Sequence, residues 1–460
     1  MDGSYFFRLM RVCGFVLLPL LISGGGVAQP AATGVASSAS AATADNVSAR
    51  ALHAEAAGYA RLKYDEFKRA GVAYDPRLVQ RVEQEQRELA AALAARLSKR
   101  KGLAGEELYY LGQLQYLAAQ SAAAVETMRR FLRELPAQQQ LEAREQARTA
   151  RFVIALHTAT SGALEEAELA LADYLSHAAE APASASAPRE RYLVETALSD
   201  AYRQRRQQPE RVIVHARAAF DAARQLVATT PAIVDMAARD EMLLRAAASL
   251  SDANLELKRT GEAIAALQDL RKLSVHLTSA DLYRRASILL ERIVPAVGLM
   301  TVPNDPLFAA THLAPEIKAE DWLGLKPTTL AALRGRVVLL DFWAIDCAPC
   351  RAALPHMKSW QEQYGKKGLT IIALTHYGSE RTAPEQFSEL KQFRRAWRLP
   401  FGFAVAAIAD TARDYRVNTI PTAVLIDRRG VARYLSVGAK ETDIAELEQM
   451  IERLINEPAN

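Results

Sequence analysis

Two cysteines lie three positions apart in the stretch LLDFWAIDCAPCRAALP at residues 339–355, where two different patterns meet. Before them, residues 336–344 (RVVLLDFWA) are almost continuously apolar, as the strands of a buried parallel sheet are. After them, residues 348–368 are amphipathic and end with Gly368, which predicts a helix and its stop. The chain must therefore fold so that a helix begins directly after a buried strand, with both cysteines at the junction.

The number of cysteines limits the chemistry of this pair. Cys13, Cys347 and Cys350 are the three cysteines of the chain, so a zinc site built from two such pairs is excluded. Attached haem would need a histidine directly after the second cysteine, where Arg351 stands. A mixed site that uses two of the eight histidines stays open, although their spacing is not that of a zinc finger. We expect no metal and no cofactor beyond a redox-active Cys347–Cys350 disulfide.

The first residues of the chain have the pattern of a secretory signal. Two arginines precede the apolar run at 12–22 and small residues follow it, which predicts a signal peptide over 1–28 with cleavage after Ala28. The run spans eleven residues and is interrupted by Pro19, whereas a spanning helix needs about 20, so we expect no stable membrane insertion. Cys13 leaves with the signal, and a lone vicinal pair outside the cytosol suits redox cycling better than a structural role. The sequence predicts export across the inner membrane to the periplasm.

Composition and charge argue against other classes of partner. Hydrophobic residues make up 50% and charged residues 24% of the chain, and the formal net charge is +4. This balance is ordinary for a soluble protein and too small to indicate binding to nucleic acid or to acidic lipid. We therefore expect no nucleic-acid partner.

The sequence pattern changes along the chain and divides it into regions. Residues 29–48 are mostly Ala, Ser and Thr and predict a flexible spacer. Residues 49–294 are rich in Ala, Leu, Arg, Glu and Gln at helical spacing, and predict an α-helical region. Residues 295–312 contain prolines without a periodic pattern and predict a linker. The last region, 313–460, has alternating strand and helix patterns, which predict an α/β domain.

Small residues recur in the helical region at the spacing of a helix-turn-helix repeat. Gly112, Ala124 twelve residues later and Pro136 define one such stretch, and Ala155 with Ala167 and residues 250–273 keep parts of the spacing. These positions resemble those of tetratricopeptide repeats over about 100–295, and a generic helical array is the alternative. Such arrays often present a concave surface to another protein. A plain packing scaffold is equally compatible with the pattern.

The position of the two cysteines indicates their chemistry. At the start of a helix, the partial positive charge of the unpaired amides stabilises a thiolate, so Cys347 is the expected nucleophile. Cys350 lies one turn later and faces inward, where it can attack a mixed disulfide at Cys347 and release the reduced partner. Pro349 suits the first turn of the helix because its missing N–H costs nothing there.

The segment DFWAIDCAPCRAALP (341–355) resembles the active-site segment of the thioredoxin superfamily, and NTIPTAVLIDRRG (418–430) resembles its cis-proline loop and hairpin. The residues before the first strand and the segment 376–402 are similar to those of the TlpA/ResA-like thiol-disulfide oxidoreductases of the periplasm. The resemblance covers about 313–456 and implies a central mixed sheet flanked by helices. The predicted fold class is an α-helical repeat-like N-terminal domain plus an α/β thioredoxin-like C-terminal domain.

The resemblance also implies roles for single residues. Cys347 is the attacking thiol, Cys350 is the resolving thiol, and Asp341 matches the buried acid that accepts the proton of the resolving cysteine. Residues implied in substrate binding are Trp343, Pro349, Ile420 and the cis-proline Pro421. An Asp in an apolar strand should independently be desolvated, with a raised pKa that suits base catalysis. An Asp that is merely hydrogen-bonded at the strand end is the alternative.

Asp346 departs from the family pattern, which usually has Trp directly before the first cysteine. An anion beside Cys347 should disfavour its thiolate and oppose both the helix dipole and Arg351. We expect Asp346 and Arg351 to tune the redox couple, with Asp346 making it more reducing.

The predicted function is a thiol-disulfide oxidoreductase that exchanges disulfides with protein substrates and is served by a membrane or periplasmic electron donor. Peroxidase chemistry is a related alternative, but the Pro-x-x-x-Thr-x-x-Cys pattern of peroxiredoxins is absent from the sequence. A non-enzymatic alternative is a helical interaction or scaffold protein that uses the thioredoxin-like domain as a docking module.

Overall fold

The computed structural model of the chain describes residues 47–72, 75–136, 140–177, 187–206, 208–229, 235–294, 313–379, 381–406 and 410–458. The predicted signal peptide with its cleavage site at Ala28, nearly all of the spacer and the predicted linker lie outside these residues. The chain forms two compact units, Met1–Ser184 and Ala185–Asn460. None of the described helices is both long and apolar enough to span a bilayer.

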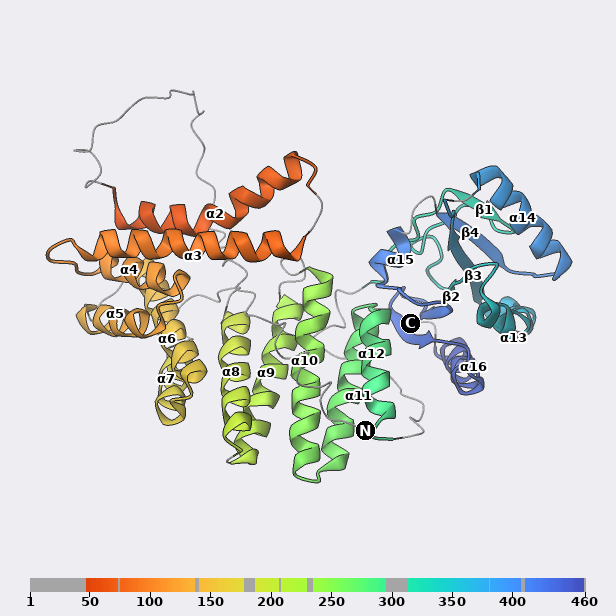
Figure 1. The fold of residues 1–460 in the computed structure, drawn as a ribbon. Coiled ribbons are helices and arrows are strands. Elements are labelled where there is room, and N and C mark those ends of the chain that lie inside the picture. The colour runs from red at the N-terminus through yellow and green to blue at the C-terminus, as the bar shows by residue number, and fades with distance from the viewer. Residues whose placement is uncertain are drawn as a thin grey trace, which may run out of the picture. The chain divides into compact units, whose positions relative to one another are not determined.

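The described part of the first unit is a series of helices, each packed on the next (Figure 1). They are α2 (Ala49–Arg69), α3 (Pro76–Ser98), α4 (Glu106–Leu117), α5 (Ser121–Glu134), α6 (Leu141–Ser161) and α7 (Leu164–Ser176). Gly112 of α4 faces α5 so closely that a Cβ atom there would lie 2.7 Å from Cε of Met128. Ala124 and Ala155 are fully buried as well. The recurring small residues therefore allow the paired helices to approach each other.

The second unit begins with another set of paired helices. They are α8 (Ala187–Arg205), α9 (Pro209–Thr229), α10 (Met236–Glu256), α11 (Thr260–His276) and α12 (Ala280–Glu291). Figure 1 shows these helices side by side in sequence order, and each contacts the next. Ala223, Ala247 and Ala266 are fully buried among them. The prediction of an α-helical region that precedes an α/β region is confirmed.

The rest of the second unit is built on a six-stranded mixed sheet in the order β1-β4-β3-β2-β5-β6. The strands are β1 (Asp321–Leu323), β2 (Val337–Phe342), β3 (Leu369–His376), β4 (Gly402–Ala406), β5 (Thr422–Ile426) and β6 (Ala432–Val437). Strands β2, β3 and β4 are parallel, whereas β1, β5 and β6 run antiparallel to their neighbours. The helical elements are α13 (Ala348–Tyr364), the 3-10 turn Gly365–Lys367, α14 (Ala383–Ala396), α15 (Asp410–Asp414) and α16 (Glu441–Asn456). The predicted thioredoxin-like fold class is confirmed.

Four elements of this domain, β1, β4, α14 and α15, were not predicted from the sequence. Strand β1 has 3 residues and helix α15 has 5, so neither is long enough to show a period. Strand β4 reads GFAVA, with small residues that have a weak preference for strands. It is a strand because it pairs with β3 on one side and β1 on the other. Tertiary pairing, rather than local preference, makes β4 a strand.

Side chains along β2 alternate between two cores, one on each face of the sheet. Val337, Leu339 and Trp343 belong to the core that also contains Cys350 and Leu354 of α13. Val338, Leu340 and Phe342 face a second core, which includes Val275 of α11 and Tyr283 of α12. Helices that precede residues 295–312 in the sequence therefore share a core with the sheet that follows this segment.

Candidate active site

The two cysteines lie where strand β2 leads into helix α13. Cys347 is the N-cap of α13 and forms a disulfide with Cys350, with 5.2 Å between their Cα atoms. The backbone N–H of Cys350 donates to Sγ of Cys347 over 3.3 Å. Cys347 is partly exposed, whereas Cys350 is only 2% exposed. A partner sulfur can thus approach Cys347 from solvent, while Cys350 lies behind it.

The start of α13 gives Cys347 a positive electrostatic environment. The first amides of a helix have no partner within it, and their partial positive charge stabilises a thiolate at this end. Pro349 occupies the first turn and is exposed. Asp346 directly precedes Cys347 and Arg351 directly follows Cys350, and both are exposed. Solvent and salt screen exposed charges, which reduces the effect that these two residues can have on the sulfur.

Asp341 is a buried carboxyl group in the middle of the sheet. It pairs with Ala373 of β3 and Ala423 of β5, and it is 5% exposed. The alternation along β2 places Asp341 on the face of Trp343, which is the face that packs on Cys350. Burial raises the pKa of Asp341 from its ordinary value of 3.8 to about 7. The carboxyl group can therefore exchange a proton near neutral pH, as its position in an apolar strand suggests.

Residues 418–421 lead into β5, and we call them the cis-proline loop because the Ile420–Pro421 peptide bond is cis. The pairing of Phe342 with Thr422 places this loop at the end of the sheet where β2 finishes and the cysteines follow. Pro421 is buried, and its carbonyl accepts a 2.9 Å hydrogen bond from the N–H of Gly438. Ile420 is 38% exposed. The loop thus exposes the apolar side chain of Ile420 to solvent at the same end of the sheet as the dithiol.

Trp343 is placed differently from what its implied role in substrate binding requires. Its side chain is 2% exposed and packs with Phe393 of α14 and Phe403 of β4, with ring centroids 5.4 and 5.5 Å away. It shares a core with Cys350. Trp343 therefore supports the dithiol from inside the domain. The sequence did not indicate Phe393 or Phe403 as partners, because the contacts join segments that are distant along the chain.

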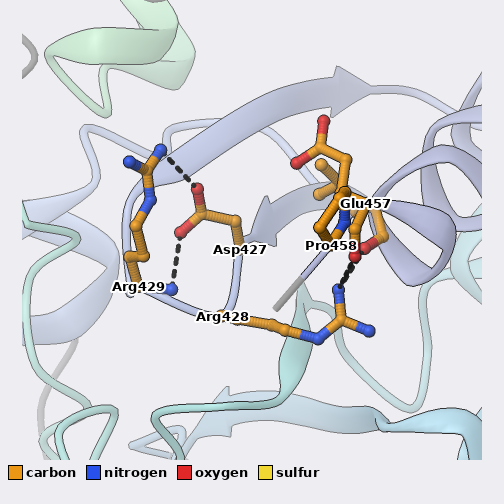
Figure 2. A pocket seen from close by; sticks show the side chains of 6 residues that line it. Asp427, Arg428, Arg429, Glu457 and Pro458 are labelled. Atoms are coloured by element: carbon orange, nitrogen blue, oxygen red, sulfur yellow. Dashed lines mark hydrogen bonds and ion pairs between the residues drawn. The ribbon is translucent and has the colours of Figure 1, made fainter. Parts of the chain in front are cut away.

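A pocket of about 250 Å³ lies at the far end of the β5–β6 hairpin (Figure 2). Its lining residues are Asp427, Arg428, Arg429, Leu454, Glu457 and Pro458. Arg428 donates hydrogen bonds to the backbone carbonyls of Leu454, Ile455 and Glu457. It thereby supplies donors for carbonyls at the C-terminal end of α16 that lack partners within the helix. Because β5 runs from the cis-proline loop towards Asp427, this pocket lies at the opposite end of the strand from the dithiol. Within the described part of the chain, no group of side chains is arranged to hold a metal ion.

Comparisons with known proteins agree with this geometry. The model of the AhpC/TSA family matches residues 310–435. The thioredoxin-like protein YneN of Bacillus subtilis is 30% identical over 139 residues, which cover 30% of this chain and 76% of YneN. The chain belongs to the thioredoxin-like family. The match to the family model does not extend over the helices α2 to α12.

Two further relatives of this thioredoxin-like chain match it over a similar length. Protein DipZ of Mycobacterium bovis is 33% identical over 152 residues, which cover 31% of this chain and 21% of DipZ. The thiol-disulfide oxidoreductase ResA of Bacillus cereus is 33% identical over 117 residues, which cover 25% of this chain and 63% of ResA. The chain thus spans about a fifth of the length of DipZ and less than two thirds of ResA.

Proposed function

We propose that this chain is a periplasmic thiol-disulfide oxidoreductase that exchanges disulfides with protein substrates through Cys347 and Cys350. The observation that carries the proposal is the disulfide at the start of α13, with one sulfur partly exposed and the other buried. A two-step exchange needs this asymmetry, because one sulfur must meet the partner and the other must resolve the intermediate. The similarity to ResA, a thiol-disulfide oxidoreductase, supports the same class of reaction.

In the reducing direction, the Cys347 thiolate attacks one sulfur of a substrate disulfide. A bond forms between Cys347 and that sulfur, and the other substrate sulfur leaves as a thiolate. Cys350 then loses its proton and attacks Sγ of Cys347, which restores the Cys347–Cys350 disulfide and releases the second substrate thiolate. Two electrons pass from the dithiol to the substrate, and the reverse sequence oxidises a substrate dithiol.

Asp341 is the proposed acceptor for the proton of Cys350. Its carboxyl group lies on the face of the sheet that packs on Cys350, and its pKa is about 7. A base whose pKa lies near the working pH can take up a proton and release it again within one catalytic cycle. Asp341 thereby links the resolving step to the protonation of a buried group.

Other parts of the proposal concern recognition and location. Pro349, Ile420 and Pro421 are the proposed substrate contacts, and Asp346 with Arg351 tunes the redox couple. Export to the periplasm rests on the signal-like residues 1–28 and cleavage after Ala28, and a membrane or periplasmic donor would supply the electrons. The proposed domains are the helical region 49–294, which serves recognition or packing, and the thioredoxin-like domain 313–460, joined by the linker 295–312.

The test is reduction of insulin by the protein in the presence of dithiothreitol, with Cys347→Ser as the control. We expect wild-type activity well above the control, and Cys350→Ala should accumulate a mixed disulfide through Cys347. Wild-type activity no greater than that of Cys347→Ser would favour the docking-module alternative. Mass spectrometry of proteins captured by Cys350→Ala would identify the substrate.

A further inference from the structure

We propose that the start of helix α12, in the helical part of the second unit, positions the cis-proline loop for the binding of protein substrates. The residue that does this is Asp281, and it acts through Asn418. The inference rests on the proposed disulfide exchange and adds a role for the helical region in it. Asp281 is a positioning residue, since it acts through another residue of the loop.

The backbone of α12 is joined directly to the segment before the cis-proline loop. The N–H groups of Ala280 and Asp281 donate to the carbonyls of Tyr415 and Arg416, over 3.0 and 3.1 Å. The first amides of a helix have no partners within it, and carbonyls at the end of a helical turn likewise need donors. The two residues that follow α15 therefore accept hydrogen bonds from the first amides of α12, which joins the two segments.

Buried side chains reinforce this junction. Asp240 of α10 is fully buried, and its Oδ2 accepts hydrogen bonds from Oγ of Ser279 at 2.5 Å and from Nε of Arg416 at 3.3 Å. Ser279 is the N-cap of α12 and also accepts from the N–H of Leu282. A buried carboxylate of this kind is stable only while its partners stay in place, because desolvation penalises an unpaired charge. The segment that carries Arg416 is thus fixed against the helices.

The contact reaches the loop through Asn418. Its Nδ2 donates to Oδ1 of Asp281 over 2.7 Å, and Asp281 is only 7% exposed. The other end of the same amide, Oδ1, accepts from Oγ1 of Thr419 at 3.3 Å. The carbonyl of Thr419 in turn accepts from Oγ1 of Thr422 at 2.7 Å. Asn418 therefore connects α12 to both sides of Ile420, the exposed residue of the loop.

This arrangement predicts a defect in substrate binding when the contact is removed. Asp281→Ala should raise KM for insulin about tenfold, the scale of losing a hydrogen bond to a charged group. The effect on kcat should be smaller. The KM for dithiobis(nitrobenzoate), a small disulfide that contacts little of the protein surface, should rise less than the KM for insulin. Asp281→Asn keeps an oxygen that can accept from Asn418, so it should restore most of the affinity.

Asn418→Ala removes the same hydrogen bond from the exposed side and tests the idea even if Asp281→Ala folds poorly. Asp281 also forms ion pairs with Arg284, Arg285 and Arg416, so the double variant should be no worse than Asp281→Ala alone. The matched control is Asp200→Ala, which breaks an exposed ion pair with Arg245 in the same unit and should leave KM unchanged. Thermal unfolding of every variant separates loss of binding from loss of folding.

Two results would overturn the inference while leaving the proposed function intact. One is a folded Asn418→Ala variant with wild-type KM for insulin. The other is a variant whose KM rises equally for insulin and for the small disulfide. A wild-type protein inactive towards both disulfides would instead contradict the proposed function itself.

Discussion

Replacing Asp341 with asparagine should stabilise the protein at alkaline pH and slow its chemistry. Asparagine has nearly the size of protonated aspartate but does not ionise, so the variant keeps a neutral group at every pH. Burial raises the pKa of Asp341 from 3.8 to about 7. Each pKa unit corresponds to about 1.4 kcal/mol, so ionising Asp341 costs about 4 kcal/mol more in the folded protein than in the unfolded chain.

The direction of the pH effect depends on which state holds the proton. Below the unfolded pKa of 3.8, Asp341 is neutral in both the folded and the unfolded chain, and its contribution to stability is fully present. As the pH rises, the unfolded chain loses this proton first, so the wild type loses stability until the folded Asp341 ionises near pH 7. The gain in free energy of unfolding from Asp341→Asn should therefore grow from small values near pH 4 to about 4 kcal/mol above pH 8.

Urea unfolding of the oxidised wild type and Asp341→Asn, followed by far-ultraviolet circular dichroism at several pH values, measures this gain. Other titrating groups are common to both proteins, so they largely cancel in the difference. At neutral pH the variant should also resolve its mixed disulfide about a hundredfold more slowly, as loss of a general base predicts. A gain that does not change with pH would refute the reasoning, since it would mean that folding does not shift the pKa of Asp341. A wild type that is the more stable protein at pH 8 would also refute it, since the carboxylate would then be stabilised in the folded state.

Alkylation of the reduced protein should label Cys347 before Cys350, because Cys350 is only 2% exposed, and peptide mass mapping that finds Cys350 labelled first would reverse their roles. Asp346→Trp should move the reduction potential upward by some tens of millivolts in a glutathione titration, since about 30 mV corresponds to roughly 1.4 kcal/mol for a two-electron couple. Asp346→Asn isolates the effect of charge, and no rise in either variant would show that solvent screens Asp346. A fragment that starts at about residue 313 should unfold at a lower urea concentration than the fragment 187–460, because it lacks Val275 and Tyr283 of the shared core. Equal unfolding midpoints would show that α11 and α12 do not stabilise that core.

The sequence by itself determined where the candidate dithiol and the buried carboxyl group lie in the fold. The spacing of Cys347 and Cys350 between an apolar strand and an amphipathic run indicated a dithiol at the start of a helix, and α13 begins there. The apolar neighbours of Asp341 along β2 indicated its burial and raised pKa. These features depend on residues close together in the chain, where a period of two or of 3.6 residues decides which side chains are buried.

Only the tertiary structure decided what surrounds the dithiol. Strand β4 exists because β3 and β1 pair with it, and Trp343 is covered by rings from other segments. The hydrogen bond between Asp281 and Asn418 joins residues 137 positions apart, and nothing near either residue in the sequence indicates the other. Its existence depends on how α11 and α12 pack against the sheet. That packing is a sum of many weak apolar contacts between distant segments, which no short sequence pattern contains.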